Sequence, residues 1–134
     1  MIEITPNKQS FARHREPRMR IIDFEIPSID ALSTSDYYAV PVPGFGMIKQ
    51  VKVEVPAGEV HVSIGITDGF TPNTNEDAVR ITNITGIFDD ANIDAHYYTK
   101  DKPADQNEGF LYVLIENISD ATGTIKMQIA IEDY

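Results

Sequence analysis

The chain has 134 residues, of which 42% are hydrophobic, and it carries a formal net charge of −10 and no cysteine. This length suits one domain with a self-sufficient core. The lack of cysteine excludes disulfides, thiolate nucleophiles and thiolate metal sites, and the acidic balance disfavours nucleic acid as a partner. Because a small secreted protein usually needs disulfides, we expect an intracellular site of assembly. No apolar run is long enough to span a membrane, and no signal-peptide pattern is visible.

The first 18 residues are interpreted as an extended N-terminal arm, because they contain Pro6 and Pro17, many charges and little apolar periodicity. Such a segment buries too little apolar surface to fold alone, so we expect it to become ordered only on a partner. The cationic side chains in and beside the arm are the candidate partner-binding residues: Lys8, Arg13, Arg15, Arg18 and Arg20. Their expected target is the acidic body of a neighbouring subunit; a solvated charged tail is the alternative.

The next elements are read from alternation. Apolar side chains at every second position predict a strand over residues 20–26. Residues 28–36 are ambiguous and could hold one helical turn. Residues 37–43 are extended, but Pro41 and Pro43 cannot donate hydrogen bonds to a ladder, so this piece is expected at a sheet edge or in a linker.

The clearest alternation lies between residues 50 and 66. Two runs place valine or isoleucine at every second position, and Pro56-Ala57-Gly58 separates them. Two such runs joined by a short Pro/Gly turn predict a β-hairpin.

The second half of the chain also consists of short predicted strands that are separated by polar loops and turns. We predict strands over residues 79–84, 95–99, 110–115 and from 125 to the end, with a loop over 86–93. The run over 110–115 is apolar on both faces, as in a central strand that is covered on each side.

These elements predict an all-β fold: an antiparallel β-sandwich, jelly-roll-like or Ig-like, of about seven or eight strands in one domain over residues 19–134. The side chains expected in its core are those on the apolar faces: Val51, Val53, Val55, Val60, Val62, Ile64, Leu114, Ile125, Met127, Ile129 and Ile131.

No catalytic or cofactor-binding fingerprint occurs, so we expect neither an enzyme nor a cofactor. The three histidines, His14, His61 and His96, are widely spaced and are read as surface residues. The acidic spacing Asp90, Asn92, Asp94 and Asp101 partly matches a calcium loop. However, Ala95 stands where such a loop needs glycine, and turn chemistry accounts better for these residues.

Tyr97 and Tyr98 leave one alternative function open. On a strand one of the two must point inward, while the other could belong to an aromatic platform for sugars. A carbohydrate-binding or adhesion module is therefore the alternative to a structural protein.

From Met47 onward, three short sequence motifs follow one another: Val62-Ser63-Ile64-Gly65, then Asp68-Gly69-Phe70, and finally Ala121-Thr122-Gly123-Thr124-Ile125. This order resembles the small β-sandwich virion structural proteins of tailed bacteriophages, which decorate heads or sit at necks and tails. The resemblance implies a non-enzymatic structural protein without catalytic residues. It would be a homo-oligomer, a trimer or a ring, that is assembled in the host cytoplasm and binds other virion proteins such as the major capsid protein. The position among head, neck and tail stays open.

Overall fold

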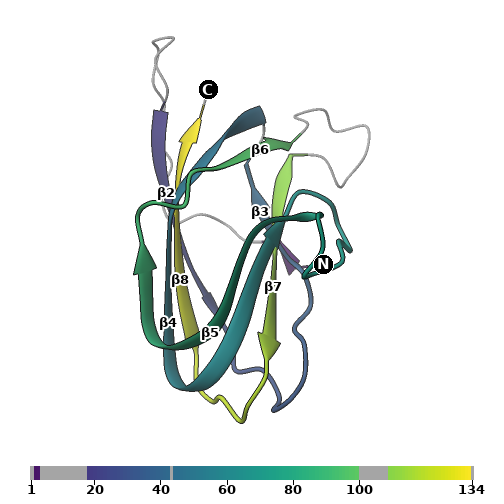
Figure 1. Ribbon diagram of the computed structural model, residues 1–134, viewed down its shortest axis with the longest axis vertical. Coiled ribbons are helices and arrows are strands. Elements are labelled where there is room, and N and C mark those ends of the chain that lie inside the picture. The colour runs from purple at the N-terminus through teal and green to yellow at the C-terminus, as the bar shows by residue number, and fades with distance from the viewer. Residues whose placement is uncertain (1, 4–17, 43, 100–108, 134) are drawn as a thin grey trace.

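The computed structural model describes residues 2–3, 18–42, 44–99 and 109–133. All regular structure in these residues is β, which confirms the predicted all-β class (Figure 1). The strands are β1 (Ile2–Glu3), β2 (Arg18–Ile26), β3 (Tyr38–Pro41), β4 (Gly44–Gly65), β5 (Asp77–Asp90), β6 (Ala95–Thr99), β7 (Phe110–Asn117) and β8 (Ile125–Asp133).

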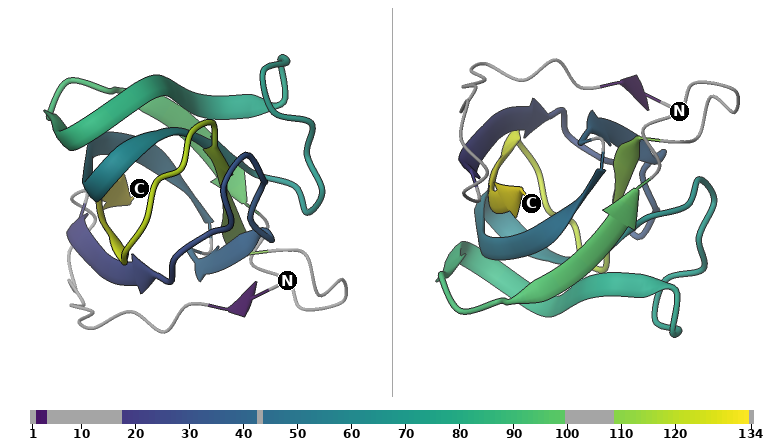
Figure 2. Two further views of the ribbon diagram at one scale, coloured as in Figure 1. Left: turned by 90° about the horizontal axis from the view of Figure 1, so that it is seen from below. Right: turned by 90° about the horizontal axis from the view of Figure 1, so that it is seen from above.

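The described strands join one continuous sheet in the order β1-β3-β7-β4-β8-β2, while β5 and β6 pair with β4 alone. Every pairing is antiparallel except the short one between β1 and β3. The sheet curls strongly, so that the views along the long axis show strands surrounding a common interior (Figure 2). Curvature of this one sheet encloses the core.

β4 is the element that makes the curl possible. Its first half pairs with β8 and its second half with β7, so one strand serves both sides of the molecule. The predicted β-hairpin over residues 50–66 is therefore wrong, because all but the last of these residues lie in a single strand of 22 residues whose two halves pair with different strands. Pro56-Ala57-Gly58 forms a bend within that strand. Proline and glycine suit a bulge as well as a turn, which is why the pattern misled.

The bend keeps the apolar side chains pointing inward. Val55 and Val60 have opposite parity, so a straight strand would turn one of the two runs toward solvent. The register with β5 shifts here, where Glu54 faces Ile87 but Glu59 already faces Thr85. The extra residues of β4 restore the inward face, and both runs reach the core.

β5 is also longer than predicted, since it continues through the expected loop at residue 86 to Asp90. The predicted core itself is confirmed. Each of its members is at most 3% exposed: Val51, Val53, Val55, Val60, Val62, Ile64, Leu114, Ile125, Met127, Ile129 and Ile131.

The outer face of β7 has a small core of its own. The loop over residues 66–76 folds back so that Phe70, which is 1% exposed, packs with Tyr112 and Leu114. Gly65 makes room for this ring, because a Cβ there would lie 2.6 Å from it. Residues 111–115 are all buried, which confirms the prediction of a central strand covered on each side.

The N-terminal segment differs in part from the expected arm. Ile2 and Glu3 pair with Tyr38 and Ala39 of the same chain, so these two residues do not wait for a partner to become ordered. β3 consequently has β1 on one side and β7 on the other, rather than lying at a bare edge. Arg18, expected in the arm, begins β2. The remainder of the arm, residues 1 and 4–17, lies outside the described residues.

Candidate functional site

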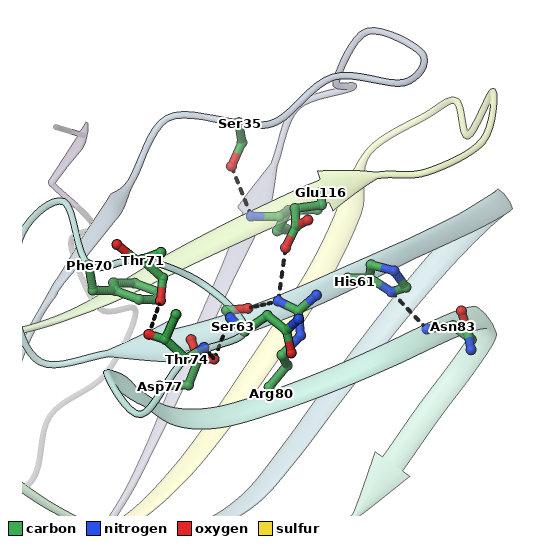
Figure 3. Close-up of polar contacts among 12 residues, drawn as sticks. Ser35, His61, Ser63, Phe70, Thr71, Thr74, Asp77, Arg80, Asn83 and Glu116 are labelled. Atoms are coloured by element: carbon green, nitrogen blue, oxygen red, sulfur yellow. Dashed lines mark hydrogen bonds and ion pairs between the residues drawn. The ribbon is translucent and has the colours of Figure 1, made fainter.

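Three strands share an organised polar surface on the outside of the sheet (Figure 3). Arg80 of β5 is its centre: Nη1 donates to Ser63 Oγ of β4 at 2.8 Å and to Glu116 Oε1 of β7 at 2.9 Å. The Arg80 and Glu116 side chains are only 17% and 25% exposed, so the pair is partly shielded from water. This network ties β5, β4 and β7 together and leaves the guanidinium engaged with the chain's own groups.

His61 lies on the same outer face, two residues before Ser63. Its Nδ1 accepts a hydrogen bond from the Asn83 backbone N–H at 3.0 Å. Asn83 has a φ of 57° and sits where β5 carries an extra residue, between the pairs Val60↔Ile84 and Val62↔Ile81. The His61 ring thus provides a hydrogen-bond acceptor for a backbone N–H group in the bulge of β5. Within the described part of the chain no hydrogen bond joins His61 to Ser63, so the nucleophile–base pair of a hydrolase is not formed there.

The loop over 66–76 is held by side chains at its end. Asp77 Oδ2 accepts from the backbone N–H groups of Asn73 and Thr74, at 2.6 and 3.2 Å. Glu76 Oε2 accepts from the Thr71 N–H. These carboxylates satisfy backbone donors of the loop, as aspartate does in turns.

Tyr37 fastens the same loop from the other side. Its hydroxyl donates to the Phe70 carbonyl, and the two rings meet edge to face with centroids 5.3 Å apart. Partial burial raises the pKa of Tyr37 above its usual 10.0, and the carboxylates of Asp68, Glu76, Asp77 and Glu116 raise it further. The folded protein therefore favours the protonated phenol.

We expect this contact to weaken at alkaline pH. A pKa that is raised on folding contributes stability that is present below the usual pKa and is lost as pH rises through the folded value. Tyr37→Phe should therefore show a smaller fall in melting temperature than the wild type between about pH 8 and about pH 11. Tyr38, whose pKa is also raised by burial, stays in both proteins as an internal reference. Equal falls in the two proteins would contradict the role given to Tyr37.

A cleft of about 560 Å³ opens where β6 meets the starts of β4 and β5. The outward rings of Phe45 and Tyr98, directly opposite each other on β4 and β6, stand at its wall with centroids 6.4 Å apart. They are 51% and 62% exposed. Tyr97 is 5% exposed, which confirms that one tyrosine of the adjacent pair points inward. The loop before β5 and His96 complete the lining.

The residues predicted to bind partners are placed as follows. Lys8, Arg13 and Arg15 lie outside the described residues, and Arg18 is placed as the first residue of β2. Arg20 is only 8% exposed, on the face of β2 that carries Ile22. Alternation with Ile22 places position 20 on the inward face, but arginine is rarely buried in a strand, so Arg20 was read as a surface cation.

The described residues of the partial calcium-loop pattern make local hydrogen bonds and an ion pair. Asp90 Oδ1 accepts from the Asn92 N–H at 2.9 Å, and Asp94 pairs with Lys49. Asp101 lies outside the described residues. Among the residues described, no three acidic, histidine or cysteine side chains gather in a way that could hold a metal ion.

β2 provides a third surface feature. Within the described ranges β2 pairs with β8 alone, so the opposite edge of this nine-residue strand faces no other described strand. Met19 and Ile21 project outward from it and are 53% and 52% exposed. Their outward direction follows from the alternation with Ile22, so the sequence contained the signal for this apolar pair.

The described residues contain no helix that is long and apolar enough to cross a membrane. No protein-family model and no curated protein matches the chain. Among solved structures, the chain is similar to a protein from work described as "Bacillus endospore appendages form a novel family of disulfide-linked pili". The identity is 14% and the TM-score 0.42, with 95% of this chain and 96% of that chain covered. A likeness this distant carries no functional argument.

Proposed function

We propose that this chain is a non-enzymatic structural protein that acts through protein–protein contacts. In its more specific form, the proposal is a component of a tailed-phage virion that decorates or joins the capsid, neck or tail. The observation that carries the general proposal is the edge of β2, where a long strand with two exposed apolar side chains has a single described neighbour.

The chemistry of this edge favours a protein partner. An edge strand presents backbone N–H and C=O groups that another chain can pair with, and proteins that stay monomeric usually protect such edges with charges, bulges or prolines. β2 carries outward Asp23 and Glu25 toward its end, but Met19 and Ile21 lie at its start. A strand added beside this apolar start would gain backbone hydrogen bonds and side-chain burial together.

The virion assignment is supported by the three short sequence motifs, between Val62 and Ile125, that resemble those of phage structural proteins. We propose that the first partner is another copy of the chain, in a trimer or a ring, and that other virion proteins such as the major capsid protein follow. Assembly would take place in the host cytoplasm. The acidic composition supports a protein partner over nucleic acid, since a net charge of −10 repels the phosphate groups.

Sedimentation velocity at micromolar concentration tests this proposal. The wild type should sediment as a species larger than the 15.0 kDa monomer, and Ile21→Lys should shift it toward the monomer. A charge at this exposed position is solvated in the free subunit but must be desolvated in an apolar contact, so association should weaken at least about tenfold.

Leu32→Lys is the matched control, because Leu32 is an apolar side chain that is 78% exposed in a turn outside every strand. It should assemble like the wild type, and far-UV circular dichroism should show that both variants are folded. A wild type that is monomeric and does not bind purified phage capsids would refute the proposal, and so would an Ile21→Lys variant that assembles normally.

A further inference from the structure

The cleft beside β6 is lined by aromatic and polar side chains. One wall is aromatic, from Phe45 and Tyr98, and the other is polar, from the loop before β5. The polar network around Arg80 and the β2 edge do not contribute to it. It is therefore a separate feature from the surface on which the proposed function rests.

The aromatic wall is held in place by its neighbours along the strand. Tyr97 and Thr99, on either side of Tyr98, are 5% and 3% exposed and anchor β6 to the body. Thr99 Oγ1 donates to the Gly44 carbonyl at 3.0 Å, at the start of β4. Tyr98 is thereby kept outward, next to Phe45. The two neighbouring rings, each about half exposed and tilted 36° to each other, offer an apolar surface for a ligand to stack on.

The polar wall is equally well fixed. The bond from Thr71 N–H to Glu76 holds that carboxylate, and the bonds to Asp77 hold the backbone around Asn75. A ligand would meet a preformed site, which lowers the ordering cost of binding.

The types of polar group discriminate between classes of ligand. Glu76 can only accept hydrogen bonds, Asn75 can both donate and accept, and His96 offers the two nitrogens of its ring. An anion would be repelled by the carboxylates of Glu76 and Asp77. A cationic side chain would only donate, and it would leave the amide and imidazole donors unmatched. A hydroxyl group both donates and accepts, so a neutral polyhydroxylated ligand uses the whole lining.

We propose that this cleft is a binding site for a neutral saccharide. A sugar ring stacks with its C–H face on Tyr98 and Phe45, while its hydroxyl groups bond to Glu76, Asn75 and His96. The site is independent of the β2 edge, so a protein that assembles through that edge can carry a sugar-binding cleft on every subunit.

Nuclear magnetic resonance of the full-length chain tests the proposal. Maltohexaose, cellohexaose and chitohexaose are added separately at millimolar concentration to the 15N-labelled protein. At least one of them should shift the amide signals of Gly46, Glu76 and Tyr98, which line the cleft. Tyr98→Ala should weaken that binding at least about tenfold, because aromatic stacking commonly contributes this much, whereas Tyr98→Phe should retain it.

Ile87→Ala, an exposed apolar change outside the cleft, should bind like the wild type. The proposal is overturned if none of the three saccharides shifts these amides, or if Tyr98→Ala binds as tightly as the wild type. If hexalysine shifts the same amides and the saccharides do not, the cleft is a cation site instead. The Ile21→Lys variant should still bind the saccharide, so failure of assembly and failure of sugar binding are separate results.

Discussion

Gly58→Ala should lower the free energy of unfolding by about 3 kcal/mol or more. Gly58 has a φ of 89°, and a Cβ built there would lie 2.3 Å from Ala121 Cα and 2.6 Å from Ala121 Cβ. The obstacle is partly backbone, held by the bridge between Ala57 and Thr122, so it cannot move aside cheaply. The measurement is the midpoint of urea unfolding, which should fall at an unchanged slope.

Gly44→Ala separates the clash from the backbone conformation. Gly44 lies in the same strand with a φ of 96°, but a Cβ there would meet nothing within 4 Å. Gly44→Ala should lower the free energy of unfolding by about 1 kcal/mol, which is the cost of placing a non-glycine residue in the left-handed region. Equal losses for the two variants would mean that the approach of Ala121 to the bend in β4 does not constrain the fold.

Asn117→Ala should be nearly as destabilising, by about 3 kcal/mol. Asn117 is 3% exposed, and its amide Nδ2 donates to the carbonyls of Ile29 and Ala121, both at 3.0 Å. Its Oδ1 accepts from the N–H groups of Ser119 and Ala121. Truncation leaves buried and partly buried backbone groups on two separate loops without the partners that Asn117 provides. Thermal unfolding monitored by circular dichroism measures the loss.

Asn92→Ala is the control for this substitution, because Asn92 is exposed and should change stability by no more than about 0.5 kcal/mol. Asn117→Asp provides a stricter comparison. It keeps the acceptor oxygen but places a second oxygen toward the Ile29 and Ala121 carbonyls, so it should be destabilising as well. A stable Asn117→Asp variant would show that the donor bonds of Asn117 contribute little.

Alternation predicted which side chains are buried, because in a strand every second residue faces the same way whatever its neighbour is. Val53, Val62 and Ile129 were placed correctly for that reason. The same rule could not distinguish a hairpin from a bent strand at Pro56-Ala57-Gly58. That choice depends on whether β7 and β8 lie beside β4, and this is information from distant parts of the sequence.

The cleft was only partly visible in the sequence. Strand geometry predicted that one of Tyr97 and Tyr98 points inward, but not which of the two. Phe45, Glu76 and His96 come from three separate segments, and only the folding of β6 onto β4 brings them together. The loop over 66–76 reads as polar, and nothing local indicates that Phe70 folds back to cover the outer face of β7.

The double pairing of β4 has a consequence for how the molecule folds. β4 pairs with β8 through its first half and with β7 through its second half, so neither side of the sheet can fold as an independent unit. Its partners β7 and β8 follow it in sequence by dozens of residues, which gives the fold a high contact order and predicts slow formation. Once formed, the two sides share one cooperative unit. Backbone amides in the two paired halves of β4, on either side of the bend, should therefore exchange with solvent only when the whole chain unfolds, whereas those facing outward on β2 can exchange by local opening.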